Sequence, residues 1–171
     1  MTKLGWIIAM MMVLAFLAAC AGGVVRGDPT LWEAAQRLSG RNCHGCPPPS
    51  IVRTTDMSDE HSAEFLWQTP DQINLSPDLE PGTTTDSIIV HEYVHALQFR
   101  GGELPARALR CSTEGDPGLI LGLEREAYEV QQVWLAEHYI DWTYSEHLLG
   151  VALSCMGWWV PPSPDSEGPG T

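Results

Sequence analysis

The fold is decided by the stretch TTTDSIIVHEYVHALQFRGG, which occupies residues 83–102. Its first four residues carry side-chain oxygens that can cap the start of a helix. Apolar residues then recur at helical spacing from Ile88 to Leu97, until the pair Gly101 and Gly102 stops the pattern. The stretch therefore predicts one helix that runs to Arg100.

His91, Glu92 and His95 form the pattern HExxH inside this helix. Residues four apart project from one face of a helix, so both imidazoles can direct a ring nitrogen at the same metal ion. This is the spacing of a zinc hydrolase site. Glu92 points to one side of the pair, where it is placed to hold water and act as general base and not as a ligand. The alternative is an amphipathic helix on which the three side chains are merely solvated.

A third ligand is expected from a second helix over residues 119–134. The inward stripe of this helix consists of Leu123, Ala127, Val130 and Trp134. Glu124 and Glu126 flank the stripe on opposite sides, and orientation alone does not choose between them. A glutamate on a helix usually belongs to a solvated face, so either position needs further support.

The two stretches HEYVHALQ (91–98) and EREAY (124–128) resemble the gluzincin-like metallopeptidases. In that family, HExxH on one helix is completed by a glutamate three residues before an alanine on the next helix. The resemblance implies a zinc-dependent peptidase in which His91, His95 and Glu124 bind the metal.

The same resemblance leaves Glu126 as the second choice for the third ligand and covers roughly residues 64–140. Tyr128 departs from the pattern, because many relatives have an aspartate there that supports a zinc ligand. A tyrosine hydroxyl at this position could instead stabilise the oxyanion, which makes Tyr128 a candidate catalytic residue.

Two short strands are expected before the metal helix, at residues 64–67 and 72–75. Zincin-type folds hold an extended peptide on an edge strand here, so residues 72–75 are a candidate substrate rail; the alternative is a hairpin that only covers the helix. A helix near residues 31–38 precedes them, and two or three helices follow Pro117. The chain therefore reads as an α+β domain, mostly helical, of small zincin-like form.

The N-terminus has the features of an exported protein. Lys3 precedes an apolar run that extends from Leu4 to Ala19, and LAAC at residues 17–20 resembles the bacterial lipobox, whose cysteine is lipidated after cleavage. The run is shorter than the roughly 20 residues that span a bilayer, although a retained membrane helix or simple secretion is the alternative. We expect residues 1–19 to be a signal peptide and Cys20 to anchor the protein at the bacterial cell envelope.

Without the signal peptide the chain keeps 152 of its 171 residues, which suits one domain. We expect a tether at 20–30, the metallopeptidase domain at 31–160 and a disordered tail at 161–171. With 8 arginines against 22 acidic residues, the mature chain has a formal charge of −14. This charge argues against nucleic acid as a partner and leaves the lipid as the attachment to the membrane. We expect a monomer whose partner is a peptide or protein substrate.

Four cysteines remain if Cys20 is lipidated, an even number in an oxidising compartment. We expect Cys43 to pair with Cys46 and Cys111 to pair with Cys155. The sequence establishes neither bond by itself.

Two other functions compete with the hydrolase. The pair Cys43 and Cys46 resembles the motif of thiol-disulfide proteins, but those motifs open a helix, which the prolines at 47–49 block. The second rival is a non-catalytic envelope lipoprotein that binds a partner through the same helices. A binding module has no need for Glu92 beside the first histidine, which favours the enzyme.

Overall fold

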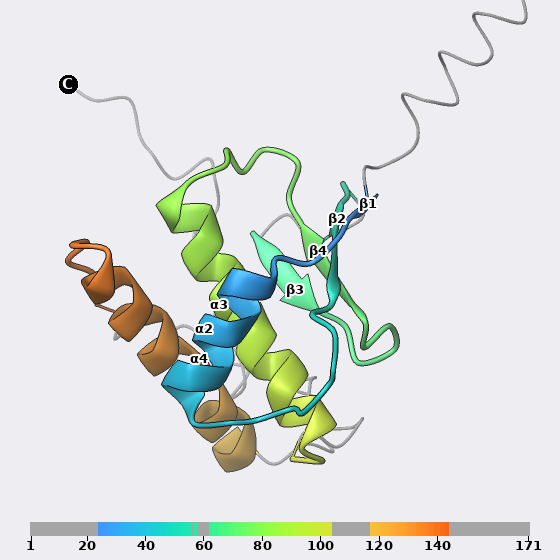
Figure 1. Cartoon of the computed structure of the whole chain (residues 1–171), viewed down its shortest axis with the longest axis vertical. Coiled ribbons are helices and arrows are strands. Elements are labelled where there is room, and N and C mark those ends of the chain that lie inside the picture. The colour runs from blue at the N-terminus through green and yellow to red at the C-terminus, as the bar shows by residue number, and fades with distance from the viewer. Residues whose placement is uncertain (1–23, 56, 58–61, 104–116, 144–171) are drawn as a thin grey trace, which may run out of the picture.

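The computed structural model describes residues 24–55, 57, 62–103 and 117–143, and within these ranges the chain is an α+β fold with three helices and a four-stranded mixed sheet (Figure 1). The elements in chain order are β1 (Val24–Val25), α2 (Pro29–Ser39), β2 (Ser50–Arg53), β3 (Ala63–Phe65), β4 (Gln72–Leu75), α3 (Thr83–Arg100) and α4 (Pro117–Glu137). In this part of the chain no helix is both long enough and apolar enough to cross a bilayer.

The sheet has the strand order β1-β2-β4-β3. The hairpin, which was the alternative to a substrate rail, is confirmed, because β3 and β4 pair antiparallel with Phe65 opposite Ile73, although β3 spans Ala63–Phe65 and not the predicted 64–67. However, β4 also pairs in parallel with β2, so hydrogen-bond partners occupy both of its edges. The prediction that residues 72–75 form an open substrate rail is therefore wrong, and β3 is the edge strand on this side of the sheet.

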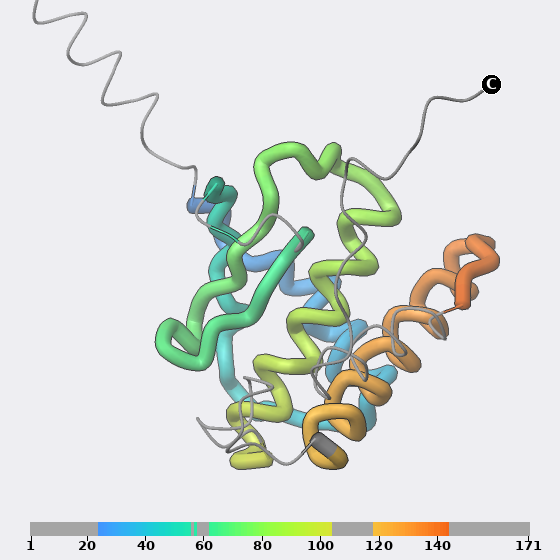
Figure 2. The backbone as a smooth tube through the Cα atoms, turned by 180° about the vertical axis from the view of Figure 1, so that it is seen from behind, coloured from blue at the N-terminus to red at the C-terminus, as the bar shows by residue number. Residues whose placement is uncertain are grey.

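Helix α3 is the centre of the fold. It lies between the β3-β4 hairpin and α4 in both views, and it also contacts α2 (Figures 1 and 2). Every residue from Ile89 to Gln98 is buried. A helix that is buried on all sides places its polar side chains inside the protein, so His91, Glu92 and His95 do not form an exposed face of an amphipathic helix.

The two ends of α3 differ from each other. The N-cap is Gly82, and none of the expected side-chain oxygens caps the helix. Instead, the hydroxyl of Thr85 donates to the carbonyl of Glu80, outside the helix. The predicted end is confirmed, because the N–H of Gly101 bonds the carbonyl of Leu97 at 2.8 Å.

The face of α3 opposite the histidines is fixed by α2. The carboxylate of Asp28 caps α2 by accepting the N–H of Thr30 at 2.7 Å, and the N–H of Asp28 donates to the hydroxyl of Tyr93 at 3.0 Å. The ring of Tyr93 meets Trp32 edge to face, with ring centroids 5.3 Å apart. These contacts hold α3 in place from the side away from the candidate site.

Some predictions from sequence lie outside the described residues: the signal peptide at 1–19, lipidation of Cys20, the Cys111 to Cys155 pairing and the tail at 161–171. The predicted pair Cys43 and Cys46 lies inside them, and the structure places its two sulfur atoms at bonding distance. β1 and the first residues of α2 fall within the stretch 20–30 that was assigned to the tether.

Candidate metal centre

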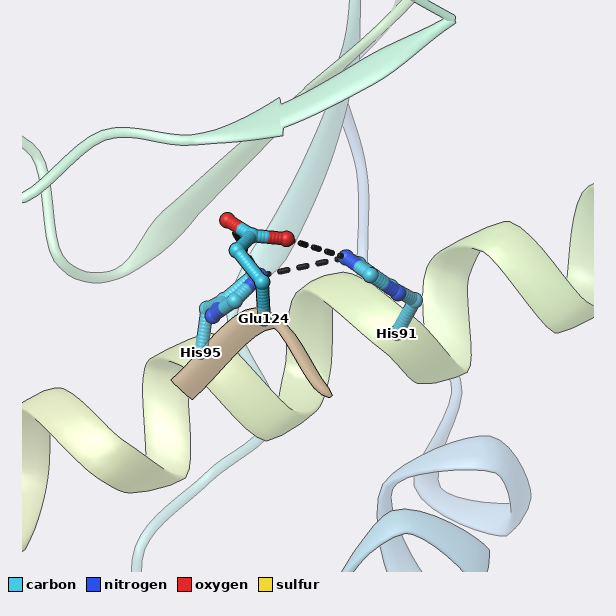
Figure 3. Close-up of side chains that lie close together, drawn as sticks. All are labelled: His91, His95 and Glu124. Atoms are coloured by element: carbon cyan, nitrogen blue, oxygen red, sulfur yellow. Dashed lines mark hydrogen bonds and ion pairs between the residues drawn. The ribbon is translucent and has the colours of Figure 1, made fainter. Parts of the chain in front are cut away.

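Three predicted ligands converge on one point. His91 and His95 project from α3, and Glu124 projects toward them from α4 (Figure 3). The Nε2 atoms of the two imidazoles are 3.1 Å apart, and each lies 3.5 Å from one carboxylate oxygen of Glu124. The histidines are buried, whereas the Glu124 side chain is 22% exposed, so the triangle opens on one side.

The size of this triangle matches a zinc site. Ligand atoms about 2.0–2.1 Å from a tetrahedral zinc ion lie about 3.3 Å from one another. The observed separations of 3.1, 3.5 and 3.5 Å surround that value. Three protein ligands also leave the fourth position of a tetrahedron to water or substrate, as catalytic zinc sites do.

The charges of the site favour a cation. Burial opposes ionisation of Glu124, but the adjacent imidazoles of His95 and His91 hold the pKa of its carboxyl well below the usual range. Burial likewise opposes protonation of His95, but the attraction of Glu124 dominates and raises the pKa of His95 to about 9. In the metal-free protein the positive charge on His95 therefore compensates the carboxylate, which is the role that a metal ion takes over.

Glu92 lies beside the triangle and is not part of it. Its side chain is buried, and Oε2 accepts the backbone N–H of Phe65 on β3 at 2.8 Å. This bond aims the carboxylate at the space between α3 and the edge strand. Sequence reasoning anticipated the position of Glu92 beside the ligands but not its bond to β3, since a backbone donor leaves no signal in the sequence.

Tyr128 is on the same face of α4 as Glu124, one turn further along. Its ring packs on His91, with centroids 4.4 Å apart. Burial and the nearby carboxylates of Glu124 and Glu92 raise the pKa of the phenol, so the hydroxyl stays protonated and able to donate a hydrogen bond.

Glu126, the second choice for the third ligand, points elsewhere. Its carboxylate pairs with Arg41, with Nε and Oε1 2.6 Å apart, and also accepts the amide of Gln98 at 3.1 Å. Gln98 in turn contacts His95. Sequence reasoning missed Gln98 and Arg41; the spacing of Gln98 three residues after His95 was a usable signal, whereas Arg41 lies 85 residues from Glu126 and gave none.

A cavity of about 740 Å³ adjoins the triangle. It is lined by residues 62–68, by side chains of α3 and α4, and by Ile140 and Trp142, and it includes His91, Glu92, His95, Glu124 and Tyr128. Its size is that of a pocket for a small ligand or for a few residues of a peptide.

No protein-family model, curated protein or solved structure matches this chain. The residues of the centre therefore carry any functional assignment by themselves.

Proposed function

We propose that the protein is a zinc-dependent metallopeptidase. The observation that carries the proposal is the triangle of His91, His95 and Glu124, whose separations of 3.1 to 3.5 Å suit one tetrahedral zinc ion. The resemblance of the two motif stretches to gluzincin-like peptidases points to the same ligands. Glu92, a buried carboxylate beside the triangle but outside it, adds the group that hydrolysis needs and simple metal storage does not.

The roles of the residues follow from their chemistry. Zinc, when bound, acts as a Lewis acid that polarises the scissile carbonyl and lowers the pKa of water. Glu92 accepts the proton of the attacking water and passes it to the leaving amine. Tyr128 keeps its proton at neutral pH and donates a hydrogen bond to the developing oxyanion.

The edge strand favours an extended peptide as the substrate. In an antiparallel pair, alternate residues direct their N–H and C=O groups away from the partner strand. Phe65 directs its N–H toward Glu92, so the N–H and C=O of Ala63, two residues earlier, face the same way. A peptide can add to β3 at Ala63 as a further strand, with its backbone beside the metal centre.

The lining of the cavity favours apolar side chains of that peptide over acidic ones. Its apolar members are Ala63, Phe65, Leu66, Trp67, Ile88, Leu135, Ile140 and Trp142. The described residues around it include no lysine or arginine, whereas Glu64, Glu92 and Glu124 all contribute carboxylates. An acidic side chain would therefore enter an unfavourable field.

The resemblance of residues 17–20 to the bacterial lipobox supports a location of this activity at the bacterial cell envelope, with Cys20 as the lipidated residue. Two or more acyl chains are enough for stable anchoring. Fractionation of cells expressing wild type and Cys20→Ser tests this part: the wild type is expected in the membrane fraction and the variant is not. A soluble wild type whose N-terminus lies beyond Cys20 would contradict lipidation.

The test of the metal site compares purified wild type with the double variant His91→Ala, His95→Ala. We expect about one zinc per wild-type chain and none in the variant. The same two proteins are then incubated with a mixture of peptides, and new termini are identified by mass spectrometry. Equal zinc in both proteins would refute the metal centre.

A non-catalytic binding module is the second candidate, because the bond from Phe65 to Glu92 also gives this glutamate a purely structural role. The module and the enzyme differ in one outcome. Zinc binding without cleavage of any peptide in the mixture would favour the module.

A further inference from the structure

The imidazole of His95 has a buried hydrogen-bond partner at Nδ1, the ring nitrogen that does not belong to the triangle. Its Nδ1 atom lies 2.8 Å from Oε1 of Gln98, which is fully buried one turn along α3. A carbonyl oxygen only accepts hydrogen bonds, so Nδ1 must carry the proton in this pair. With Nδ1 protonated, the lone pair of Nε2 is available to the metal.

The orientation of the Gln98 amide is fixed from α4. Its Nε2 donates to the carbonyl of Leu123 at 3.0 Å and to Oε2 of Glu126 at 3.1 Å. Both partners are acceptors only, so they require the NH₂ end of the amide, and Oε1 is left to face His95. Leu123 and Glu126 lie on either side of Glu124 in the chain. The Gln98 amide therefore connects His95 on α3 to the segment of α4 that carries Glu124.

Glu126 is itself held by Arg41, in the loop after α2. The guanidinium contacts both carboxylate oxygens, with Nε to Oε1 at 2.6 Å and Nη2 to Oε2 at 2.7 Å. The same guanidinium makes two further bonds to Glu103, at 2.7 and 2.6 Å. Paired bonds of this kind hold both partners in a defined plane, so Glu126 presents Oε2 to Gln98 in one orientation.

We propose that Gln98 is a positioning residue for the metal centre: it fixes the tautomer and ring orientation of His95, and Glu126 and Arg41 fix Gln98. The inference rests on the proposed metal site and deepens it. Loss of such an outer partner typically weakens metal binding by about 10- to 100-fold.

The main variant is Gln98→Met, which keeps the volume and removes both the acceptor and the donors. The matched control is Tyr93→Phe, which removes one part-buried hydrogen bond from the opposite face of the same helix. We expect Gln98→Met to raise the dissociation constant for zinc about 10- to 100-fold in a chelator competition. Tyr93→Phe should stay within about twofold of wild type, since Tyr93 contacts none of the ligands.

One further readout and one further variant separate positioning from loss of stability. The visible spectrum of the cobalt-substituted protein reports ligand geometry, so it should change in Gln98→Met and stay the same in Tyr93→Phe. If Gln98→Met does not fold, Glu126→Gln decides, because its side chain is 28% exposed and its carboxylate bonds Gln98 and Arg41 and none of the three candidate ligands. We expect that variant to bind zinc several-fold more weakly.

The outcomes distinguish this inference from the proposed function. If Gln98→Met and Glu126→Gln fold and match wild type in zinc affinity and cobalt spectrum, the positioning role is overturned and the metal centre is not affected. Equal weakening in Gln98→Met and Tyr93→Phe would also overturn it, because general loosening of α3 would then explain the effect. Failure of the wild type to bind zinc would overturn both.

Discussion

His91 and His95 lie one turn apart on α3 and face the same point, but their surroundings differ. The Nδ1 atom of His95 bonds Gln98, which leads to Glu126 and Arg41. The Nδ1 atom of His91 is buried and has no hydrogen-bond partner among the described residues, and the ring of Tyr128 packs beside it. The motif supplies both histidines, but tertiary contacts hold the ring of His95 in one orientation and place His91 next to Tyr128, the group proposed to act on the substrate.

We call His95 with Gln98, Glu126 and Arg41 the holding side, and His91 with Glu92 and Tyr128 the reacting side. Changes on the holding side should affect zinc binding, and changes on the reacting side should affect turnover. The largest effect on turnover is expected from Glu92→Gln. The substitution keeps an oxygen that can accept the N–H of Phe65 but removes the proton acceptor, so hydrolysis should fall by about 10²- to 10⁴-fold while zinc stays bound. Steady-state kinetics and zinc content measure the two effects.

Glu129→Gln serves as the control for Glu92→Gln, since it removes from α4 an exposed carboxylate that pairs with Arg125 and does not line the cavity. It should leave both turnover and zinc content near the wild-type values. Loss of zinc from Glu92→Gln would show that Glu92 supports the ligands and would break the division between holding and reacting groups.

Tyr128→Phe tests the reacting side directly. The ring that packs on His91 is retained and only the hydroxyl is lost. If the hydroxyl stabilises the oxyanion, kcat should fall by about 10²-fold and the zinc dissociation constant should change little. A zinc affinity that drops as far as in Gln98→Met would instead give the hydroxyl a ligand-supporting role.

The holding side predicts how zinc affinity depends on pH. With its pKa raised to about 9, His95 is protonated in the metal-free protein at neutral pH, so zinc must displace a proton. The apparent affinity should then rise about tenfold per pH unit from 7 toward 9 and level off above. Chelator competition at constant ionic strength measures this slope, and an affinity that levels off near pH 6.5 would mean that His95 titrates normally.

Stability of the metal-free protein should follow the opposite trend. Since folding raises the pKa of His95, its contribution is complete below the unfolded value of about 6.5 and is lost as pH rises through about 9. Since folding lowers the pKa of Glu124, its contribution is complete above about 4.5 and is lost at lower pH. Thermal unfolding without metal should therefore show this pair's full contribution only between about pH 4.5 and 6.5.

The sequence predicts the three candidate metal ligands better than it predicts the tertiary contacts that hold them in place. Helical periodicity around residues 83–102 locates α3 and with it His91 and His95, whereas the choice of Glu124 over Glu126 comes from the resemblance to gluzincin-like peptidases and not from periodicity. Strand β2 was missed because its four residues follow a run of prolines, and without β2 the strand β4 appears to have an open edge. The contacts of Glu92 with Phe65 and of Arg41 with Glu126 join residues 27 and 85 positions apart, which local patterns do not encode.

The smallest effect is expected from the Cys43–Cys46 disulfide, which lies on the holding side. Cys43 follows Arg41 by two residues, and its N–H donates to the side chain of Gln36 at 2.9 Å. The disulfide therefore stiffens the loop that presents Arg41 to Glu126. The chain-entropy estimate for so short a loop is on the order of 2 kcal/mol of unfolding free energy. Because Arg41 keeps its direct bonds to Glu126 and Glu103 without the disulfide, the double variant Cys43→Ser, Cys46→Ser should weaken zinc binding less than Gln98→Met does. Denaturant unfolding and chelator competition on this variant give both numbers, and a loss of zinc affinity as large as that of Gln98→Met would show that the loop, more than the buried amide, sets the position of His95.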